Sequence, residues 1–167
     1  MDSATIDPGT DYDEWFRTTF SRAVAIARRV VGPAGAEGAA LDAFASAYAR
    51  WHRVRGLAWR DGWVLQTAYR NALAMLPRHL EPLAFEPTQA SPEDSVVLRI
   101  ALVQALRRLP RWQREAVALR YLVDLPDREV PAALGVSVGR VKVHLHGGLA
   151  SLRSSLGPGL LGGGFDE

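Results

Sequence analysis

The sequence predicts an all-α protein made of two small helical domains joined by a proline-containing linker. Apolar residues recur at spacings of three and four over long stretches of both halves, which is the period of one helix face. Four prolines then fall between Pro77 and Pro92, where no period is sustained. Proline fixes φ and removes a backbone donor, so this stretch predicts an extended connection between two separately packed domains.

Length and composition favour a folded protein of a reducing compartment. The chain has 167 residues, and 48% of them are hydrophobic, which is enough for real cores. The absence of cysteine excludes disulfides, thiolate metal sites and cysteine nucleophiles. No apolar run approaches the roughly 20 residues of a membrane-spanning helix, and the N-terminus is acidic rather than basic. We therefore expect a cytoplasmic protein without membrane insertion.

The net charge of +2 hides an asymmetry along the chain. Residues 1–96 hold 10 arginines against 12 acidic residues, whereas residues 97–156 hold 10 basic against 4 acidic residues. A surface that binds nucleic acid is expected to show such local positive charge. The second half is therefore the better candidate for that role.

The first half predicts a three-helix domain over residues 1–76. One helix is expected from Trp15 to Val31 and ends at Gly32-Pro33. A second begins near Ala36, and a third runs from about Asp61 to Leu76. We expect residues 77–95 to be the linker.

The second half predicts a helical domain over residues 96–156, followed by a glycine-rich tail over 157–167. Its expected helices run over residues 97–109, 112–122, 125–134 and 138–152. The last two have the proportions of a helix-turn-helix, because Gly135 permits a left-handed turn and Ser137 can cap the final helix. Pro131 is tolerated only in a first turn, so we expect the preceding helix to start late. A plain helical hairpin remains the alternative on this pattern alone.

At these motifs the chain resembles the extracytoplasmic-function sigma factors, a subfamily of the sigma-70 factors of bacterial RNA polymerase. The segments LRRLPRWQRE (106–115), LRY (119–121) and ALGVSVGRVK (133–142) are similar to the fourth conserved region of that family. The segments DAF (42–44), AYARW (47–51) and residues 63–73 are similar to its second region. The resemblance implies a region 2-like bundle and a region 4-like helix-turn-helix. The implied function is promoter-specific transcription initiation through the −10 and −35 elements. It also implies core RNA polymerase and promoter DNA as partners, allows an anti-sigma factor, and implies neither catalysis nor a cofactor.

The resemblance assigns candidate residues to each contact. In the second half, DNA contact is expected from residues at the start of the last helix, namely Ser137, Val138, Arg140, Lys142 and His144. In the first half it is expected from Trp59, Arg70 and Arg78, near the −10 element. Asp42 and Arg50 are the candidates for binding core polymerase.

The chain departs from the family where these contacts are made. Several arginines usually follow the position of Lys142, whereas this chain has Val143, His144 and then Gly147-Gly148. Fewer cations mean fewer phosphate contacts, and glycines weaken a helix, so we expect the last helix to end or bend there. In the first half, Gly38 and Leu41 replace polar residues of the family. These departures support an alternative, a divergent sigma-like regulator that acts through protein contacts with little or no promoter recognition.

Other patterns predict no chemistry. His144 and His146 lie on different sides of a helix and cannot chelate one metal, so solvated or backbone-bonded histidines are the expectation. We find no set of titratable residues that indicates an enzyme active site. Trp51, Trp59, Trp63 and Tyr69 could stack on unpaired bases, but their helical spacing favours core positions for most. Trp59, in a predicted loop, is the expected exception.

Overall fold

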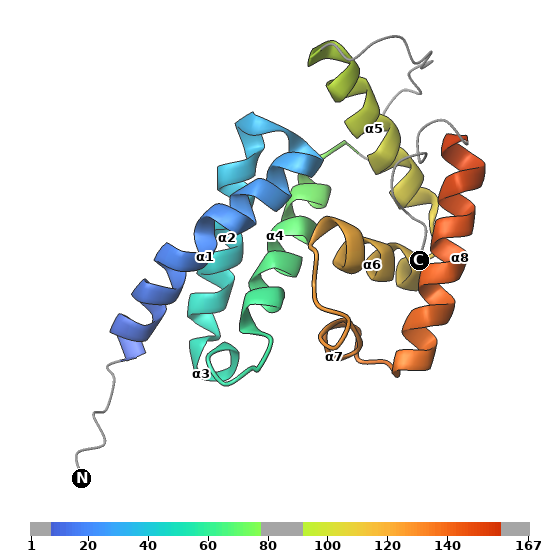
Figure 1. Cartoon of the computed structure of the whole chain (residues 1–167). Helices are drawn as coiled ribbons and strands as arrows, with labels where there is room; N and C mark the ends of the chain where they lie inside the picture. Colours follow the sequence, from blue (N-terminus) through green and yellow to red (C-terminus); the bar gives the residue numbers. More distant parts are fainter. Residues whose placement is uncertain (1–7, 78–91, 158–167) are drawn as a thin grey trace. The chain divides into compact units, whose positions relative to one another are not determined.

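A computed structural model of the chain describes residues 8–77 and 92–157, which are helical with short connections (Figure 1). The chain divides at Leu76 into two compact units. The all-α fold class is therefore confirmed. Most of the expected linker, the expected tail beyond Gly157, and the candidate Arg78 lie outside the described residues.

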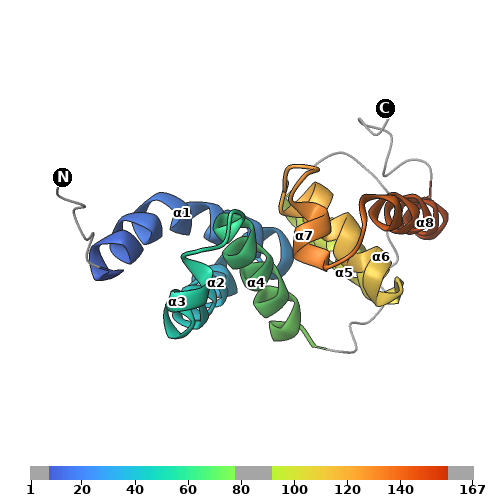
Figure 2. The same cartoon turned by 90° about the horizontal axis from the view of Figure 1, so that it is seen from below.

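The described part of the first unit, residues 8–76, is a bundle of three long helices and one short one. Helices α1 (Pro8–Val31), α2 (Pro33–Ala49) and α4 (Arg60–Met75) pack against one another, and α3 (Trp51–Val54) is a turn of helix between α2 and α4 (Figures 1 and 2). Gly32, at φ 79°, interrupts the helix between α1 and α2, and Pro33 is the first residue of α2. The expected break at Gly32-Pro33 is confirmed, whereas α3 was not predicted.

Two helices of this unit start earlier than the apolar pattern predicts. The expected start of α1 at Trp15 is wrong by about two turns. The early turns are held by Tyr12, whose hydroxyl donates to the Phe44 carbonyl at 2.8 Å and whose ring packs edge-on against Tyr48 and Trp51. The expected start of α2 near Ala36 is also late, because Pro33 and the residues after it complete its first turn.

The buried face of α2 is made mainly of alanine, which lets α1 and α4 approach its backbone closely. Phe44 is the large side chain on this face and lies among the aromatic rings of α1. The fully buried alanines are Ala36, Ala39, Ala40, Ala43 and Ala47. Small side chains at the contacts between helices permit close packing without voids.

The second unit contains the helix-turn-helix. Helix α5 (Pro92–Arg108) starts inside the range expected for the linker and ends before Pro110. Helix α6 (Arg111–Val117) continues into a π-helical turn, η1 (Ala118–Leu122), where one continuous α-helix was expected. Helices α7 (Val130–Leu134) and α8 (Val138–Leu156) follow. Leu106, Leu109, Val117 and Leu152 form the core that joins α5, α6 and α8.

Candidate nucleic-acid interface

The turn between α7 and α8 has the geometry of a helix-turn-helix. Pro131 lies in the first turn of α7, so the expected late start of this helix is confirmed. Gly135 follows it in the left-handed conformation at φ 66°, and the Val136 N–H donates back to the Pro131 carbonyl at 3.2 Å. This bond satisfies a carbonyl at the end of α7, and the left-handed Gly135 redirects the chain into α8 within a few residues.

Ser137 caps α8, as expected. Its hydroxyl oxygen accepts a long hydrogen bond from the Arg140 backbone N–H at 3.4 Å, and its own backbone is extended. The cap leaves the first turn of α8 open to solvent, and the side chains of Val138, Arg140 and Lys142 are all exposed. Such an exposed N-terminal turn is what a recognition helix inserts into the major groove.

The expected end of α8 at Gly147-Gly148 is wrong, because α8 continues to Leu156. The alternative of a bend there stays a prediction. Gly148 is buried, and a Cβ atom added there would lie 2.7 Å from Cγ2 of Val117 and 3.3 Å from the Gln113 carbonyl oxygen. The missing side chain lets α8 approach α6 closely. Packing between the two helices thus compensates the low helix propensity of glycine.

His144 does not have the solvated or backbone-bonded environment expected of it. Its ring is half-buried and stacks on Trp112 of α6, with 6.3 Å between ring centroids and 19° between planes. The Arg111 guanidinium lies 5.3 Å from the centroid of the Trp112 indole. His144 is therefore turned toward α6, and its contact with DNA stays a prediction.

Trp112 and Arg111 lie at the surface beside α8, which was not predicted from the sequence. Trp112 is 42% exposed and lies directly after the N-terminus of α6. A signal was present, since a tryptophan just after Pro110 precedes the buried residues of α6. The partner on α8 could not be read from the sequence.

Arg120, which belongs to the segment LRY (119–121), forms ion pairs within the second unit. Its guanidinium pairs with Asp127 at 2.7 Å and with Asp124 at 3.7 Å. Asp124 has a positive φ of 56°, which an aspartate tolerates better than most residues. The ion pairs tie η1 to the loop that leads into α7.

The first-unit candidates lie on two different elements. Trp59 is half-buried at the N-cap of α4, and Arg70 is exposed eleven residues later, roughly on the same side of the helix. Asp42 is exposed on α2, and Arg50 ends that helix with its guanidinium donating to the Ser46 carbonyl at 3.2 Å. Trp51 and Tyr69 are buried, as expected of most of these aromatics, while Trp63 is half-buried.

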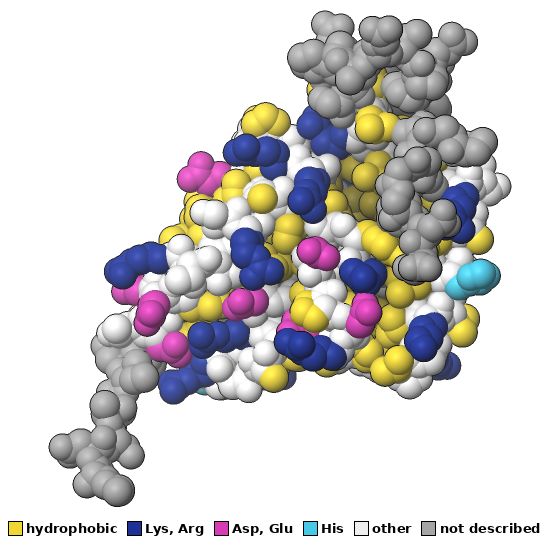
Figure 3. All heavy atoms as spheres, viewed as in Figure 1, with side chains coloured by type: hydrophobic (Ala, Val, Ile, Leu, Met, Phe, Trp, Pro, Cys, Tyr) yellow, Lys and Arg dark blue, Asp and Glu magenta, His cyan; other side chains and the backbone are white. Residues whose placement is uncertain are grey.

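A network of polar and aromatic side chains fixes the start of α4 beside α1. The Trp15 indole Nε1 donates to Asp61 Oδ1 at 2.6 Å, and Arg22 pairs with the other oxygen of Asp61 at 3.6 Å. The Arg60 guanidinium lies 5.8 Å from the Trp15 ring and 6.0 Å from the Trp51 ring, and it pairs with Asp11 at 3.4 Å. Figure 3 shows basic and acidic side chains interspersed on the face of the first unit that is turned toward the viewer.

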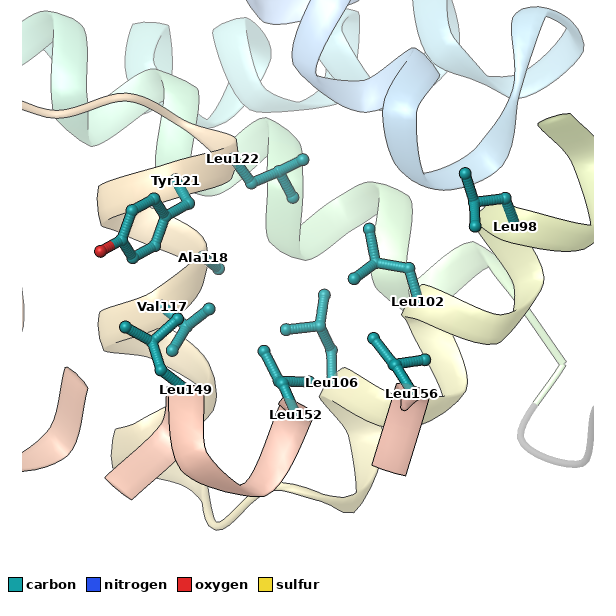
Figure 4. A pocket seen from close by; sticks show the side chains of 10 residues that line it. All are labelled: Leu98, Leu102, Leu106, Val117, Ala118, Tyr121, Leu122, Leu149, Leu152 and Leu156. Atoms are coloured by element: carbon teal, nitrogen blue, oxygen red, sulfur yellow. The ribbon is translucent and has the colours of Figure 1, made fainter. Parts of the chain in front are cut away.

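The second unit also carries an apolar groove of about 300 Å³ (Figure 4). Leucines of α5 and α8 form its walls, and residues of α6 and η1 close it. The lining residues are Leu98, Leu102, Leu106, Val117, Ala118, Tyr121, Leu122, Leu149, Leu152 and Leu156. Across the described ranges, no group of three or more acidic or histidine residues is placed to hold a metal ion. None of the helices described is long and apolar enough to cross a membrane.

Comparisons with known proteins agree with this geometry. The family described as sigma-70, region 4 matches residues 99–152, which include the helix-turn-helix. The RNA polymerase sigma-E factor of Streptomyces coelicolor is 31% identical over 152 residues, which cover 87% of this chain and 86% of that protein. The chain belongs to the sigma-70 family of RNA polymerase sigma factors.

Further relatives place it among the extracytoplasmic-function factors of that family. The sigma-E factor of Streptomyces avermitilis is 30% identical over 155 residues, covering 87% of this chain and 85% of that protein. The sigma factor CarQ of Myxococcus xanthus is 34% identical over 100 residues, which cover 56% of this chain and 57% of that protein. As a sigma factor, the chain directs RNA polymerase to promoters, and the alternative of a factor without promoter recognition is not favoured.

The fold has a match among solved structures. The sigma factor RpoE of Bartonella quintana, solved in complex with the anti-sigma factor NepR, aligns with a TM-score of 0.57. The alignment covers 87% of this chain and 96% of that chain at 18% identity. This likeness supports the two-domain helical fold.

Proposed function

We propose that this sigma factor reads the −35 element with the first turns of α8 and the −10 element with the surface around Trp59 and Arg70. The observation that carries the proposal is the capped, solvent-exposed start of α8 with Arg140 and Lys142. Neither side chain forms an ion pair with another residue in the described part of the chain, so both are available to DNA. Arg78, in the same sequence neighbourhood as Arg70, is proposed to extend the −10 contact.

The two cations have different roles in this proposal. An arginine in the first turn of a groove-bound helix can reach the O6 and N7 atoms of a guanine with a bidentate pair, worth roughly 1–3 kcal/mol of discrimination. A lysine farther along meets phosphate and contributes to every sequence alike. Few cations line α8, so the second unit alone binds DNA weakly, and core polymerase supplies the remaining affinity.

A salt series of DNA binding tests these roles. The full chain with core polymerase is titrated onto duplex promoter fragments at several salt concentrations. Lys142→Ala should weaken binding to all sequences and lower the logarithmic salt slope by about 0.9. Arg140→Ala should reduce the difference between the preferred and the scrambled element. A salt slope that neither substitution changes would show that α8 does not contact DNA.

Protein partners are part of the same proposal. We propose that Asp42 and Arg50, exposed at α2, contact core polymerase in the cytoplasm, where polymerase and chromosome meet.

An anti-sigma factor is a further proposed partner, since RpoE of Bartonella quintana was solved with one. The apolar groove of the second unit suits the apolar side chains of an amphipathic helix of such a protein. Leu98→Glu, at an exposed position of the groove, should weaken co-purification of that partner, with Val96→Glu as the control on the same helix.

A further inference from the structure

The outward face of α8 is apolar at its centre. Val141, Gly148 and Leu152 are the buried residues of α8 and mark the side packed on the unit's core. At about 100° per residue, the opposite side is centred near Val143 and also includes Gly139 and Ala150. Val143 is 69% exposed, more than the other large hydrophobic residues that are exposed in the described parts of the chain.

The two cations of α8 flank this apolar centre. Arg140 and Lys142 lie roughly 80° to either side of the outward direction. A helix that enters the major groove with this face first therefore points Val143 at the base edges. Long, charged side chains reach past it on both sides.

Gly139 is a glycine that the fold does not require. Its φ is not positive, and a Cβ atom added there would meet nothing within 4 Å. Gly135, by contrast, has a positive φ, and Gly148 packs against α6. A position without a side chain beside Val143 brings the helix backbone closer to whatever this face contacts, so that a short side chain can touch it.

We propose that Val143 contacts the 5-methyl group of a thymine in the −35 element and makes that thymine a determinant of specificity. This inference rests on the proposed DNA contact of α8. Valine neither donates nor accepts hydrogen bonds, and the thymine methyl is the apolar group that base pairs present in the major groove. The DNA sequence that α8 recognises is therefore determined partly by van der Waals contact with Val143, in addition to the hydrogen bonds of Arg140.

The test removes the methyl group from the DNA. Duplexes are selected from a random-sequence pool by the full chain bound to core polymerase, and each thymine of the enriched upstream element is replaced in turn by deoxyuridine. At one position, the wild type should lose about fourfold in affinity, the effect of one methyl group left in water. Val143→Ala should bind the unmodified duplex more weakly and should not respond to that replacement. Val96→Ala, an exposed valine of α5, is the matched control and should respond like the wild type.

Gly139→Ala gives a second readout. The substitution should raise the melting temperature, because alanine favours the helix and meets no neighbour, while it weakens binding to the selected duplex. The inference is overturned if no deoxyuridine weakens binding, or if the wild type and Val143→Ala respond equally. It is also overturned if Gly139→Ala binds DNA as well as the wild type. If the pool yields no enriched sequence at all, the proposed promoter recognition itself fails.

Discussion

Gly148 of α8 lies against Val117 of α6 so closely that a Cβ atom at the glycine would stand 2.7 Å from Val117 Cγ2. The neighbouring Gly147 differs, because its nearest neighbour is the flexible amide end of Gln113, at 2.8 Å. A Cβ atom at Gly148 would meet a packed core side chain and backbone, which cannot yield easily. The Gln113 amide that faces Gly147 can move aside.

Gly148→Ala should therefore destabilise the protein. Overpacking of this kind costs about 1–3 kcal/mol, which exceeds the gain in helix propensity of about 1 kcal/mol. Chemical denaturation of the full chain measures the change in free energy of unfolding. Gly147→Ala is the matched control and should be neutral or stabilising. Equal stabilisation by both substitutions would mean that α8 does not pack on α6 at Gly148.

Asp61→Ala should destabilise the first unit. The substitution leaves the buried Trp15 Nε1 without its acceptor and removes the partner of Arg22. A buried donor left unsatisfied costs about 1–3 kcal/mol. Asp42→Ala, an exposed carboxylate of α2, is the control and should stay within about 0.5 kcal/mol of the wild type. Thermal melting with fluorescence of the tryptophans compares the two. Equal melting temperatures for Asp61→Ala and the wild type would contradict the bond from Trp15.

Asp42→Arg should weaken binding to core polymerase, since it reverses the charge on the proposed contact face of α2. Glu14→Arg makes the same charge change on the exposed side of α1 and should leave binding unaltered. Binding of labelled full chain to purified core enzyme at low salt gives the two dissociation constants. If Asp42→Arg binds as tightly as the wild type, polymerase contacts another face.

Local rules predicted the helix-turn-helix from the sequence. The positive φ of Gly135, the cap at Ser137 and the late start of α7 at Pro131 each follow from the conformational limits of one residue. The break at Gly32-Pro33 was predictable for the same reason.

Features that depend on contacts between distant residues could not be predicted. Glycines at 147 and 148 weaken an isolated helix, and only the packing of Gly148 on Val117 shows why α8 continues. The early start of α1 depends on Tyr12 reaching Phe44, 32 residues away. His144 was expected to be solvated or bonded to backbone, and its stacking on Trp112 could not be predicted because Trp112 lies on another helix.

Run-off transcription with purified core RNA polymerase tests whether this chain directs initiation at a promoter through α8. The template carries an upstream element selected by the full chain bound to core enzyme, and a second sigma factor on its own promoter shows that the core enzyme is active. A discrete transcript should appear that depends on this chain and is largely lost in the variant with Arg140→Ala and Lys142→Ala combined. Absence of a chain-dependent transcript, with the control promoter active, would show that this chain does not direct initiation at the selected element.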